Sequence, residues 1–324
     1  MTTDTMQATR VQPEDEYYIF DLNPQVHREH VYYRTRYGVE IAADLYFAKD
    51  LDLTVKHQAL VVGPPFGGVK EQSPGVYANQ LAQSSFVVLA FDPAYHGYSG
   101  GQPRYSGSPD TYVEDFSAGV DYLGSLDYVD RNQIGALGIC ASGGFALAAA
   151  AQDARIKAVA TSVLYDIPHL AGLASGEARI EQLQALSRQR WEDQSVAPKN
   201  YPDQPVTSFP DGLDPVTHEF FSFYGFKRGW HPHALRNITA VSNLSFMNFE
   251  ATRRINEISP RPVMMVTSEE AHSKAFTDET FERLNNPKQL VVLPHGQHVD
   301  FYDDLSIIPF DKFVQFFKDH LTKK

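Results

Sequence analysis

The sequence predicts an α/β protein with a mostly parallel sheet, helices on both faces of that sheet, and a helical cap inserted between two strands. Continuous apolar runs of strand length, such as Ala59–Val62 and Phe86–Phe91, lack the alternation of a half-exposed strand and are typical of strands buried on both faces. Stretches with helical spacing, such as Val113–Leu126, alternate with these runs, as in proteins with a parallel sheet. The alternation stops from Pro168 to about Asn256, which indicates an insertion.

Composition and charge restrict the class of protein. The chain has 324 residues, of which 43% are hydrophobic and 21% charged, as in an ordinary globular protein with a large core. Its 28 basic and 40 acidic residues give a net charge of -12. Because a surface of that sign repels phosphate backbones and anionic lipids, we expect neither nucleic acid nor a membrane as a partner.

The amino terminus and the cysteine content predict a cytoplasmic location. Residues 1–16 are polar and acidic, unlike a signal peptide, and no stretch approaches the roughly 20 apolar residues that span a bilayer. Cys140 is the single cysteine, so we expect no intramolecular disulfide, which fits a reducing compartment.

The expected elements follow an irregular leader that ends at about residue 29. Two runs rich in β-branched and aromatic residues, His30–Arg36 and Glu40–Phe47, predict an antiparallel hairpin. Further strands are expected at Ala59–Val62, Phe86–Phe91, Gln133–Ile139, Ile156–Val163, Arg261–Thr267 and Gln289–Leu293, and helices at Tyr77–Gln83, Val113–Leu126, Ala146–Gln152 and Phe310–Leu321.

The expected domain organisation is one core with one insertion. The core comprises residues 30–166 and 257–324, and residues 167–256 form a cap over the ends of the strands. Within the cap, a helical stretch at Glu177–Trp191 is followed by Pro-rich and aromatic loops. A separate binding domain over the same residues is the alternative.

The segment Ile134–Gly144 carries the strongest chemical signal. A buried strand leads into the pattern small-x-Cys-x-small and then into a helix, which is the nucleophile-elbow pattern with Cys140 as the nucleophile. The turn is so tight that the residues two before and two after the nucleophile must be small, and here they are Gly138 and Ser142. The positive end of the following helix stabilises a thiolate.

Two other interpretations of this segment stay open. In the first, Cys140 is an inert buried residue that ends a core strand beside glycines that permit close packing. In the second, Ser142 is the nucleophile, because the same pattern of small residues fits around it when the strand continues for two more residues. We favour Cys140 over both.

His298 is the expected general base. It lies just past a buried strand and before the last helix, at the carboxyl end of the sheet, where open α/β folds bind ligands. The order cysteine, carboxylate, histidine also matches the chain order of hydrolase triads. His295 is the second candidate. His231 and His233 suggest a metal site, but no ligand at helix spacing accompanies them, so we interpret them as a loop pair.

The acid that orients the base has three candidates. The usual place is four residues after the strand Arg261–Thr267, where this chain has Ala271. Asp166 stands alone in an apolar context at the end of another strand, where a carboxylate is costly unless it has a partner. We rank Asp166 first, Glu270 second and Glu269 third.

The tetrahedral intermediate of acyl transfer needs two backbone donors. The N–H of Ala141, directly after the nucleophile, is one expected donor. The other comes from the loop after Ala59–Val62, in which Pro64 and Pro65 have no N–H. Phe66 is the better placed residue of that loop, ahead of Gly67.

The chain resembles the α/β-hydrolase superfamily over roughly residues 30–324. Three motifs in order are similar to those of the YcjY-type hydrolases, namely Gly63–Gln72, Phe91–Gly101 and Gly138–Gly144, and they are followed by Pro260–Val263 and Ala271–Ser273. These hydrolases are related to dienelactone hydrolase, which also uses a cysteine nucleophile, and to fungal polyketide acyltransferases. The resemblance implies the α/β-hydrolase fold but no particular substrate, and Ala271 departs from the commonest triad pattern.

The sequence therefore predicts a hydrolase for an ester, thioester or lactone that forms an acyl-enzyme on Cys140. Transfer of the acyl group to an alcohol or amine is the close alternative, and an inert ligand-binding protein of hydrolase fold is the alternative from another class. We expect no cofactor and no metal, and the sequence is compatible with a homo-oligomer. The cap aromatic residues predict an apolar or aromatic acyl substrate; they are Trp191, Phe209, Phe220, Phe221, Phe223, Tyr224, Phe226 and Trp230.

Overall fold

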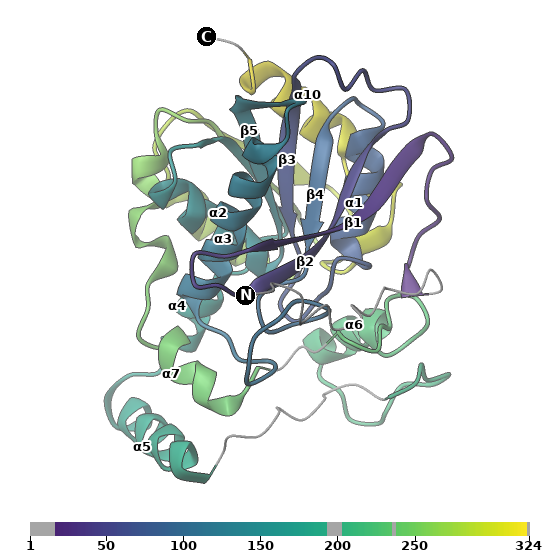
Figure 1. The fold of residues 1–324 in the computed structure, drawn as a ribbon. Coiled ribbons are helices and arrows are strands. Elements are labelled where there is room, and N and C mark those ends of the chain that lie inside the picture. The colour runs from purple at the N-terminus through teal and green to yellow at the C-terminus, as the bar shows by residue number, and fades with distance from the viewer. Residues whose placement is uncertain (1–16, 193–202, 235–237, 323–324) are drawn as a thin grey trace, which may run out of the picture.

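Eight strands form one twisted sheet in the computed structural model, which describes residues 17–192, 203–234 and 238–322 (Figure 1). The strand order is β1-β2-β4-β3-β5-β6-β7-β8. The strands β1 and β2 pair antiparallel with each other and β2 pairs antiparallel with β4, whereas β3 to β8 are parallel to their neighbours. The strands are β1 (Val26–Arg34), β2 (Glu40–Ala48), β3 (His57–Gly63), β4 (Val87–Phe91), β5 (Val129–Ile139), β6 (Ile156–Ser162), β7 (Val263–Ser268) and β8 (Lys288–Leu293).

Helices cover both faces of this sheet, which confirms the predicted fold class. Helices α2 and α3 pack against each other and against β5 on one face, while α1 and α10 pack together on the other. The helices of the sheet layers are α1 (Ser73–Ala82), α2 (Pro109–Ser125), α3 (Ala141–Gln152), α8 (Lys274–Arg283), α9 (Asp300–Asp303) and α10 (Phe310–His320).

The apolar runs of the sequence form the centre of the sheet because helices cover them on both sides. All five residues of β4 are buried, and Leu60, Val61 and Val62 of β3 are 0% exposed. Such strands have no solvent face and therefore show no period-two alternation. The hairpin prediction also holds, since β1 and β2 pair along their whole length.

Several element boundaries differ from the expectation: α1, α2 and β5 each begin four residues earlier than predicted. Strand β1 begins at Val26 rather than His30, and Phe20 before it already packs against the core. Helix α3 begins at Ala141 rather than Ala146, because the chain turns into the helix directly at the elbow. Gly143 and Gly144 have low helix propensity, so the start of α3 could not be recognised from local preference.

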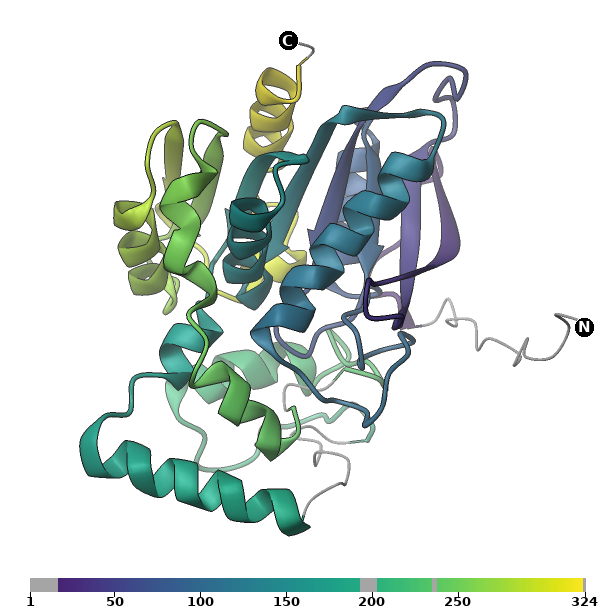
Figure 2. The same cartoon turned by 60° about the vertical axis from the view of Figure 1, so that its left-hand side comes forward.

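Between β6 and β7 the described residues form helices and loops but no strand. We call residues 167–256 the cap segment. Its helices gather at the end of the sheet opposite the C-terminal helix α10 (Figures 1 and 2). They are α4 (Ile167–Ala171), α5 (Gly176–Glu192), α6 (Pro215–Tyr224), η2 (Ala240–Ser242), α7 (Asn243–Phe246) and, running into the core, η3 (Ala251–Ile258). Across the described ranges, none of the helices has the length and apolar character needed to cross a bilayer.

Candidate active site

Cys140 lies between β5 and α3 in a conformation that side-chain-bearing residues rarely adopt. Its backbone angles are φ +56° and ψ −120°, and the residue is 4% exposed. Backbone hydrogen bonds hold it there: its N–H donates to Ser162 at 2.9 Å, and its carbonyl accepts from Gly143 at 2.9 Å and from Tyr165 at 3.0 Å. This strained position between a strand and a helix has the geometry of a nucleophile elbow.

Gly138 shows why the elbow needs small neighbours. A Cβ atom at this position would lie 2.0 Å from the carbonyl oxygen of Ser142 in the first turn of α3. No rearrangement of a flexible side chain relieves that contact, because the opposing atom belongs to the backbone. The predicted need for a small residue two positions before Cys140 therefore has a direct steric cause.

Ser142 lies inside helix α3, and its hydroxyl has a different partner. The Oγ donates to the carbonyl oxygen of Pro64 at 2.5 Å, and the side chain is buried. The positive φ that marks the elbow belongs to Cys140 and not to Ser142. Ser142 therefore ties the helix to the loop that follows β3.

That loop carries the expected second oxyanion donor, so we call residues 64–68 the oxyanion loop. Pro64 and Pro65 have no N–H, and the carbonyl of Pro65 accepts from Gly68 at 2.8 Å to close a turn. Among the residues that the structure describes, the N–H groups of Phe66 and Ala141 donate to no backbone carbonyl of a turn or loop. Their role as donors to an oxyanion stays a prediction.

His298 lies after β8 and is completely buried. Its Nδ1 atom is 2.6 Å from the hydroxyl of Ser273, and its Nε2 atom is 3.0 Å from the hydroxyl of Tyr302. The ring stacks on His272, with centroids 4.7 Å apart and an interplanar angle of 28°. The edge of Phe220, from cap helix α6, packs against it at 5.4 Å between centroids. Two hydrogen bonds and two ring contacts thus fix the orientation of the His298 ring.

Tyr165 contacts both Cys140 and His298. Its N–H donates to the carbonyl of Cys140, and its ring packs edge-to-face with His298 at 5.2 Å between centroids. The ends of β5, β6 and β8 therefore bring these residues to the same edge of the sheet, which is the edge where ligands bind in such folds.

The predicted orienting acid Asp166 has partners other than His298 in the structure, and its role as the triad acid stays a prediction. Its Oδ1 accepts from the N–H of His169 at 3.1 Å as the N-cap of α4, and its Oδ2 accepts from the hydroxyl of Thr252 at 2.5 Å. The carboxylate is buried as expected, but its partners are a helix terminus and a threonine. The expected need of this buried carboxylate for a partner is therefore met by His169 and Thr252.

The two glutamates ranked behind Asp166 lie at the surface. Glu270 bonds to Nδ1 of His295 at 3.0 Å and accepts from the N–H of Gly296 at 3.0 Å; these hydrogen bonds, that of His295 first, lower the pKa of Glu270. The side chain of Glu269 is 64% exposed and lies 4.0 Å from Lys274. His295, the second candidate for the base, thus belongs to a surface pair with Glu270.

Sequence reasoning missed Ser273, Tyr302, His272 and Glu219 around His298. Glu219, on cap helix α6, places Oε2 2.8 Å from Nδ1 of His272 and accepts from the N–H of Val299 through Oε1 at 3.1 Å. A weak signal for Glu219 was present, because it directly precedes Phe220 and lies four residues before Phe223 in α6, and both phenylalanines are buried.

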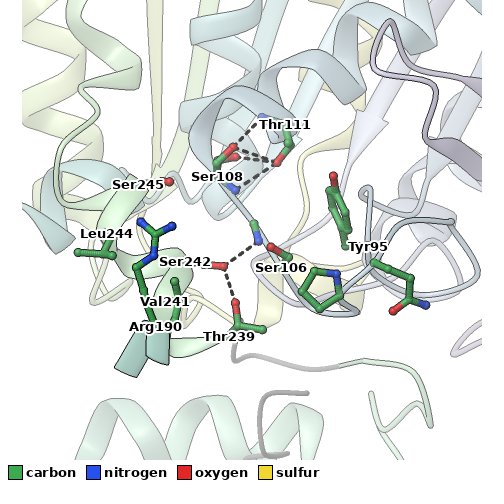
Figure 3. A pocket seen from close by; sticks show the side chains of 13 residues that line it. Tyr95, Ser106, Ser108, Thr111, Arg190, Thr239, Val241, Ser242, Leu244 and Ser245 are labelled. Atoms are coloured by element: carbon green, nitrogen blue, oxygen red, sulfur yellow. Dashed lines mark hydrogen bonds between the residues drawn. The ribbon is translucent and has the colours of Figure 1, made fainter. Parts of the chain in front are cut away.

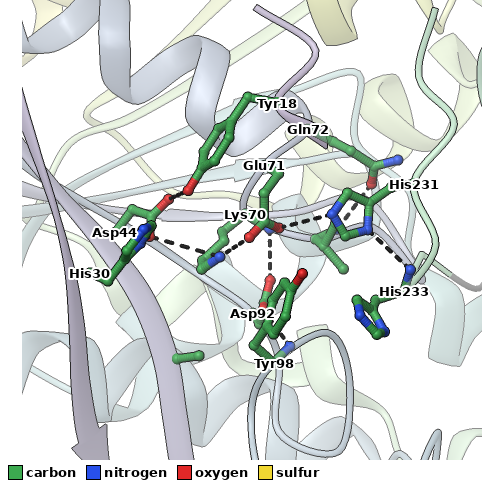
Figure 4. A network of polar contacts seen from close by, with 12 residues as sticks. Tyr18, His30, Asp44, Lys70, Glu71, Gln72, Asp92, Tyr98, His231 and His233 are labelled. Atoms are coloured by element: carbon green, nitrogen blue, oxygen red, sulfur yellow. Dashed lines mark hydrogen bonds and ion pairs between the residues drawn. The ribbon is translucent and has the colours of Figure 1, made fainter. Parts of the chain in front are cut away.

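A buried polar network lies directly after the oxyanion loop (Figure 4). The ammonium group of Lys70 pairs with Glu71 and lies 3.8 Å from Oδ1 of Asp44. The N–H of Lys70 donates to Asp92 at 2.7 Å. Burial raises the pKa of Asp44, but Lys70 and His30 outweigh that effect and hold it below its ordinary value. Because Lys70 contacts Asp44, Glu71 and Asp92, the network fixes the end of the loop to β2 and to the end of β4.

The cap segment reaches this network through His231. Its Nε2 atom is 3.6 Å from the carboxylate of Glu71, and its Nδ1 atom accepts from the N–H of His233 at 3.1 Å. Burial, together with His233 and Lys70, lowers the pKa of His231 well below its usual range, so the ring is neutral at neutral pH. In the described part of the chain, no three His, Cys, Asp or Glu side chains gather as metal ligands.

A cavity of about 750 Å³ lies beside the aromatic residues that flank the oxyanion loop (Figure 3). Cys140 and His298 are not among the residues that line it. Phe66 packs against Tyr112 and Phe246, whose neighbours Thr111 and Ser245 do line it. Its wall is rich in hydroxyl groups, from Ser106, Ser108, Thr111, Thr239, Ser242 and Ser245, and includes Arg190.

The cap aromatic residues divide into two groups. Phe220 contacts His298, and Phe223 and Tyr224 contact Tyr302. By contrast, Trp191 is 87% exposed and Phe209 is 39% exposed. An apolar substrate therefore stays a prediction, and only Phe220, Phe223 and Tyr224 support it.

A strained elbow on a mostly parallel sheet, with a buried histidine after β8, defines an enzyme of the α/β-hydrolase class. The model of the dienelactone hydrolase family matches residues 44–165. Protein PA2218 of Pseudomonas aeruginosa is 42% identical over 93% of this chain and 83% of its own length. Its crystal structure superposes with a TM-score of 0.89, at 40% identity over 96% of this chain and 98% of that one.

Two further relatives cover most of the chain. Protein YcjY of Escherichia coli is 33% identical over 83% of this chain and 90% of its own length. The acyltransferase drtE of Aspergillus calidoustus is 26% identical over 90% of this chain and 92% of its own length. The chain belongs to the dienelactone hydrolase family, as the sequence motifs indicated.

Proposed function

We propose that the protein hydrolyses an ester, thioester or lactone through an acyl-enzyme on Cys140, with His298 as the general base. The observation that carries this proposal is the strained, buried Cys140 at the start of α3. A side chain held there faces the positive end of the helix, which stabilises a thiolate. The alternative of an inert structural cysteine gives no reason for a strained backbone at this residue.

The first half of the reaction forms the acyl-enzyme. His298 takes the proton of the Cys140 thiol, and the sulfur attacks the carbonyl carbon of the substrate. The N–H groups of Phe66 and Ala141 stabilise the oxyanion. When the intermediate collapses, the bond to the leaving group breaks, and His298 returns the proton to the departing oxygen or sulfur.

The second half consumes water. His298 takes a proton from a water molecule, whose oxygen attacks the thioester carbonyl on Cys140. The carbon–sulfur bond breaks, the proton returns to the sulfur, and a carboxylic acid leaves. Ser142 contributes by holding the oxyanion loop through its bond to Pro64.

Transfer of the acyl group to an alcohol or amine is the second candidate. It is favoured by the similarity to the acyltransferase drtE over most of both chains. The two reactions share every step up to the acyl-enzyme and differ only in the nucleophile that removes the acyl group. A product that forms only when an acceptor alcohol or amine is added would identify transfer.

Aromatic rings pack around His298 at the carboxyl end of the sheet. They belong to Phe220, Tyr165 and Phe276. We therefore propose a small acyl substrate of apolar or aromatic character. The net charge of -12 disfavours nucleic acid and anionic membranes as partners, and the single thiol fits the cytoplasm.

Intact-mass measurement after mixing with p-nitrophenyl acetate tests the proposal. We expect one acetyl group per chain, located by peptide mapping on Cys140, together with a burst of p-nitrophenol. The adduct should be lost in Cys140→Ala and kept in Ser142→Ala. An acetyl group on Ser142, or the absence of both burst and adduct in the wild type, would refute the mechanism.

A further inference from the structure

His298 has a serine where a triad normally supplies a carboxylate. In a triad, an acid at Nδ1 of the histidine fixes the orientation of the ring and stabilises the imidazolium that forms during catalysis. Here the Nδ1 atom faces the Ser273 hydroxyl at 2.6 Å. A hydroxyl can accept the N–H, but it has no formal charge to offset that of an imidazolium.

Glu219 brings a carboxylate from the cap segment close to His298. Its two oxygens bond to two residues that adjoin His298, namely His272 and Val299. Oε2 bonds to Nδ1 of His272, whose ring stacks on that of His298, and Oε1 accepts from the N–H of Val299, the next residue in the chain. One acid thus fixes both the stacked ring and the backbone that carries the base.

The surroundings make this a closed and specific contact. The side chains of His272 and Glu219 are 16% and 12% exposed. Phe220, the next residue of α6, packs edge-on against both His272 and His298, with centroids 5.2 Å and 5.4 Å apart. A charge that is shielded from water on these sides interacts more strongly with a developing imidazolium than one at the surface.

We infer that Glu219, on cap helix α6, is the positioning acid of this site and acts through His272 and the N–H of Val299. The inference rests on the proposed function, since it assigns a role towards His298 as the base. The cap segment then contributes to catalysis, because Glu219 lies on α6, the helix that packs against His298. It also accounts for the absence of an acid at Ala271.

Glu219→Gln tests the inference, because it keeps the size of the side chain and removes its charge. The matched control is Glu269→Gln, an exposed acid in the loop where the triad acid usually stands. The burst rate with p-nitrophenyl acetate, the KM and the thermal midpoint are measured for each variant. We expect the burst rate of Glu219→Gln to fall about 10-fold to 100-fold, as for a small misplacement of a catalytic group, with little change in KM or midpoint. Glu269→Gln should match the wild type.

His272→Gln and the double variant Glu219→Gln/His272→Gln show whether the two residues act together. If Glu219 acts through His272, the losses in burst rate do not multiply in the double variant. If Glu219→Gln does not fold, Glu219→Asp carries the same test, since it keeps the charge; its burst rate should lie between those of the wild type and of His272→Gln.

Three results overturn the inference: a wild-type burst rate in Glu219→Gln, a loss in Glu269→Gln of the size expected for Glu219→Gln, or losses that multiply in the double variant. Failure of the proposed function looks different, because the wild type would then show no burst or His298→Ala would keep it.

Discussion

At the scale of single residues, the elbow depends on the absence of a side chain at Gly138. A Cβ atom there would meet the Ser142 carbonyl at 2.0 Å, so Gly138→Ala must move either β5 or the first turn of α3. We expect the free energy of unfolding to fall by about 3 kcal/mol or more, as for severe overpacking. Urea unfolding of the purified variant measures this.

Gly124→Ala is the matched control for that experiment. Gly124 lies in α2, and the nearest atom to an added Cβ would be Cγ of Arg131 at 3.6 Å, an ordinary contact. Alanine in a helix interior is favoured over glycine by roughly 0.5–1 kcal/mol, so this variant should be as stable as the wild type or more stable. Equal stability of the two variants would contradict the steric account of the elbow.

Asp166 is the residue for which the role expected from sequence differs most from the contacts in the structure. As a triad acid it would lose about 10⁴-fold in kcat on conversion to Asn. As the N-cap of α4 with a second bond to Thr252, it should instead affect stability. We expect Asp166→Asn to lower the thermal midpoint and to keep the burst rate within about 10-fold of the wild type. A burst lost in a stably folded variant would restore Asp166 as the acid.

At the scale of elements, the cap segment is fastened to the core beside His298 by Arg228. Its guanidinium contacts Asp303 at 2.7 Å and Asp300 at 3.1 Å, both on helix α9 directly after the base. Hydrogen bonds between charged groups contribute more than neutral ones. We expect Arg228→Ala to lower the free energy of unfolding by about 1–3 kcal/mol.

The exposed arginine Arg254 is the control for Arg228. Its pair with Glu257 within η3 has side chains 71% and 51% exposed, so Arg254→Ala should change stability little. The two variants are compared by chemical denaturation in the same buffer. A smaller loss for Arg228→Ala than for Arg254→Ala would show that this contact does not fasten the cap segment.

Most elements could be predicted because their signals are local. The apolar runs of β3 and β4 are short and rich in valine, which favours strands over buried helices, and the hairpin of β1 and β2 follows from its β-branched and aromatic residues. The start of α3 could not be predicted from helix propensity. It is set by the turn at Cys140 and by the close approach of Gly138 to the carbonyl of Ser142.

Only part of the contacts in the candidate site could be predicted from the sequence. Cys140 and its small neighbours lie within one segment, so spacing revealed the pattern. The partners of His298 come from three segments distant in the chain: Ser273 after β7, Tyr302 in α9 and Glu219 in α6. Sequence periodicity places Glu219 one helical turn before Phe223 but does not show what the carboxylate contacts, because that depends on how the cap segment folds over the sheet.

At the scale of the whole molecule, buried histidines make stability depend on pH. Burial lowers the pKa of His96 to about 4, and His231 shifts in the same direction. Below the unfolded value of about 6.5 the unfolded chain binds a proton that the folded chain does not, so stability is lost as pH falls. We expect His96 to account for a loss of about 3 kcal/mol between pH 6.5 and pH 4.

Comparison with His96→Asn isolates this contribution. Burial raises the pKa of Asp92 and of Asp115, and these groups act in the opposite direction as pH falls. Asn can still donate to the Ala94 carbonyl that His96 contacts at 2.9 Å. Unfolding free energies at several pH values should show a flatter acid limb in the variant. Parallel curves for the two proteins would exclude His96 as the cause.

The rate and selectivity of covalent labelling test the central claim most directly, namely that Cys140 is a nucleophile activated by His298. Wild-type protein and the variants Cys140→Ala, Ser142→Ala and His298→Ala are treated at neutral pH with iodoacetamide or with a fluorophosphonate, and the adducts are counted by mass. We predict rapid labelling of the wild type and of Ser142→Ala by iodoacetamide, slower labelling of His298→Ala, and no fluorophosphonate adduct in any variant. A fluorophosphonate adduct that survives in Cys140→Ala and disappears in Ser142→Ala would contradict the account and make the serine the nucleophile.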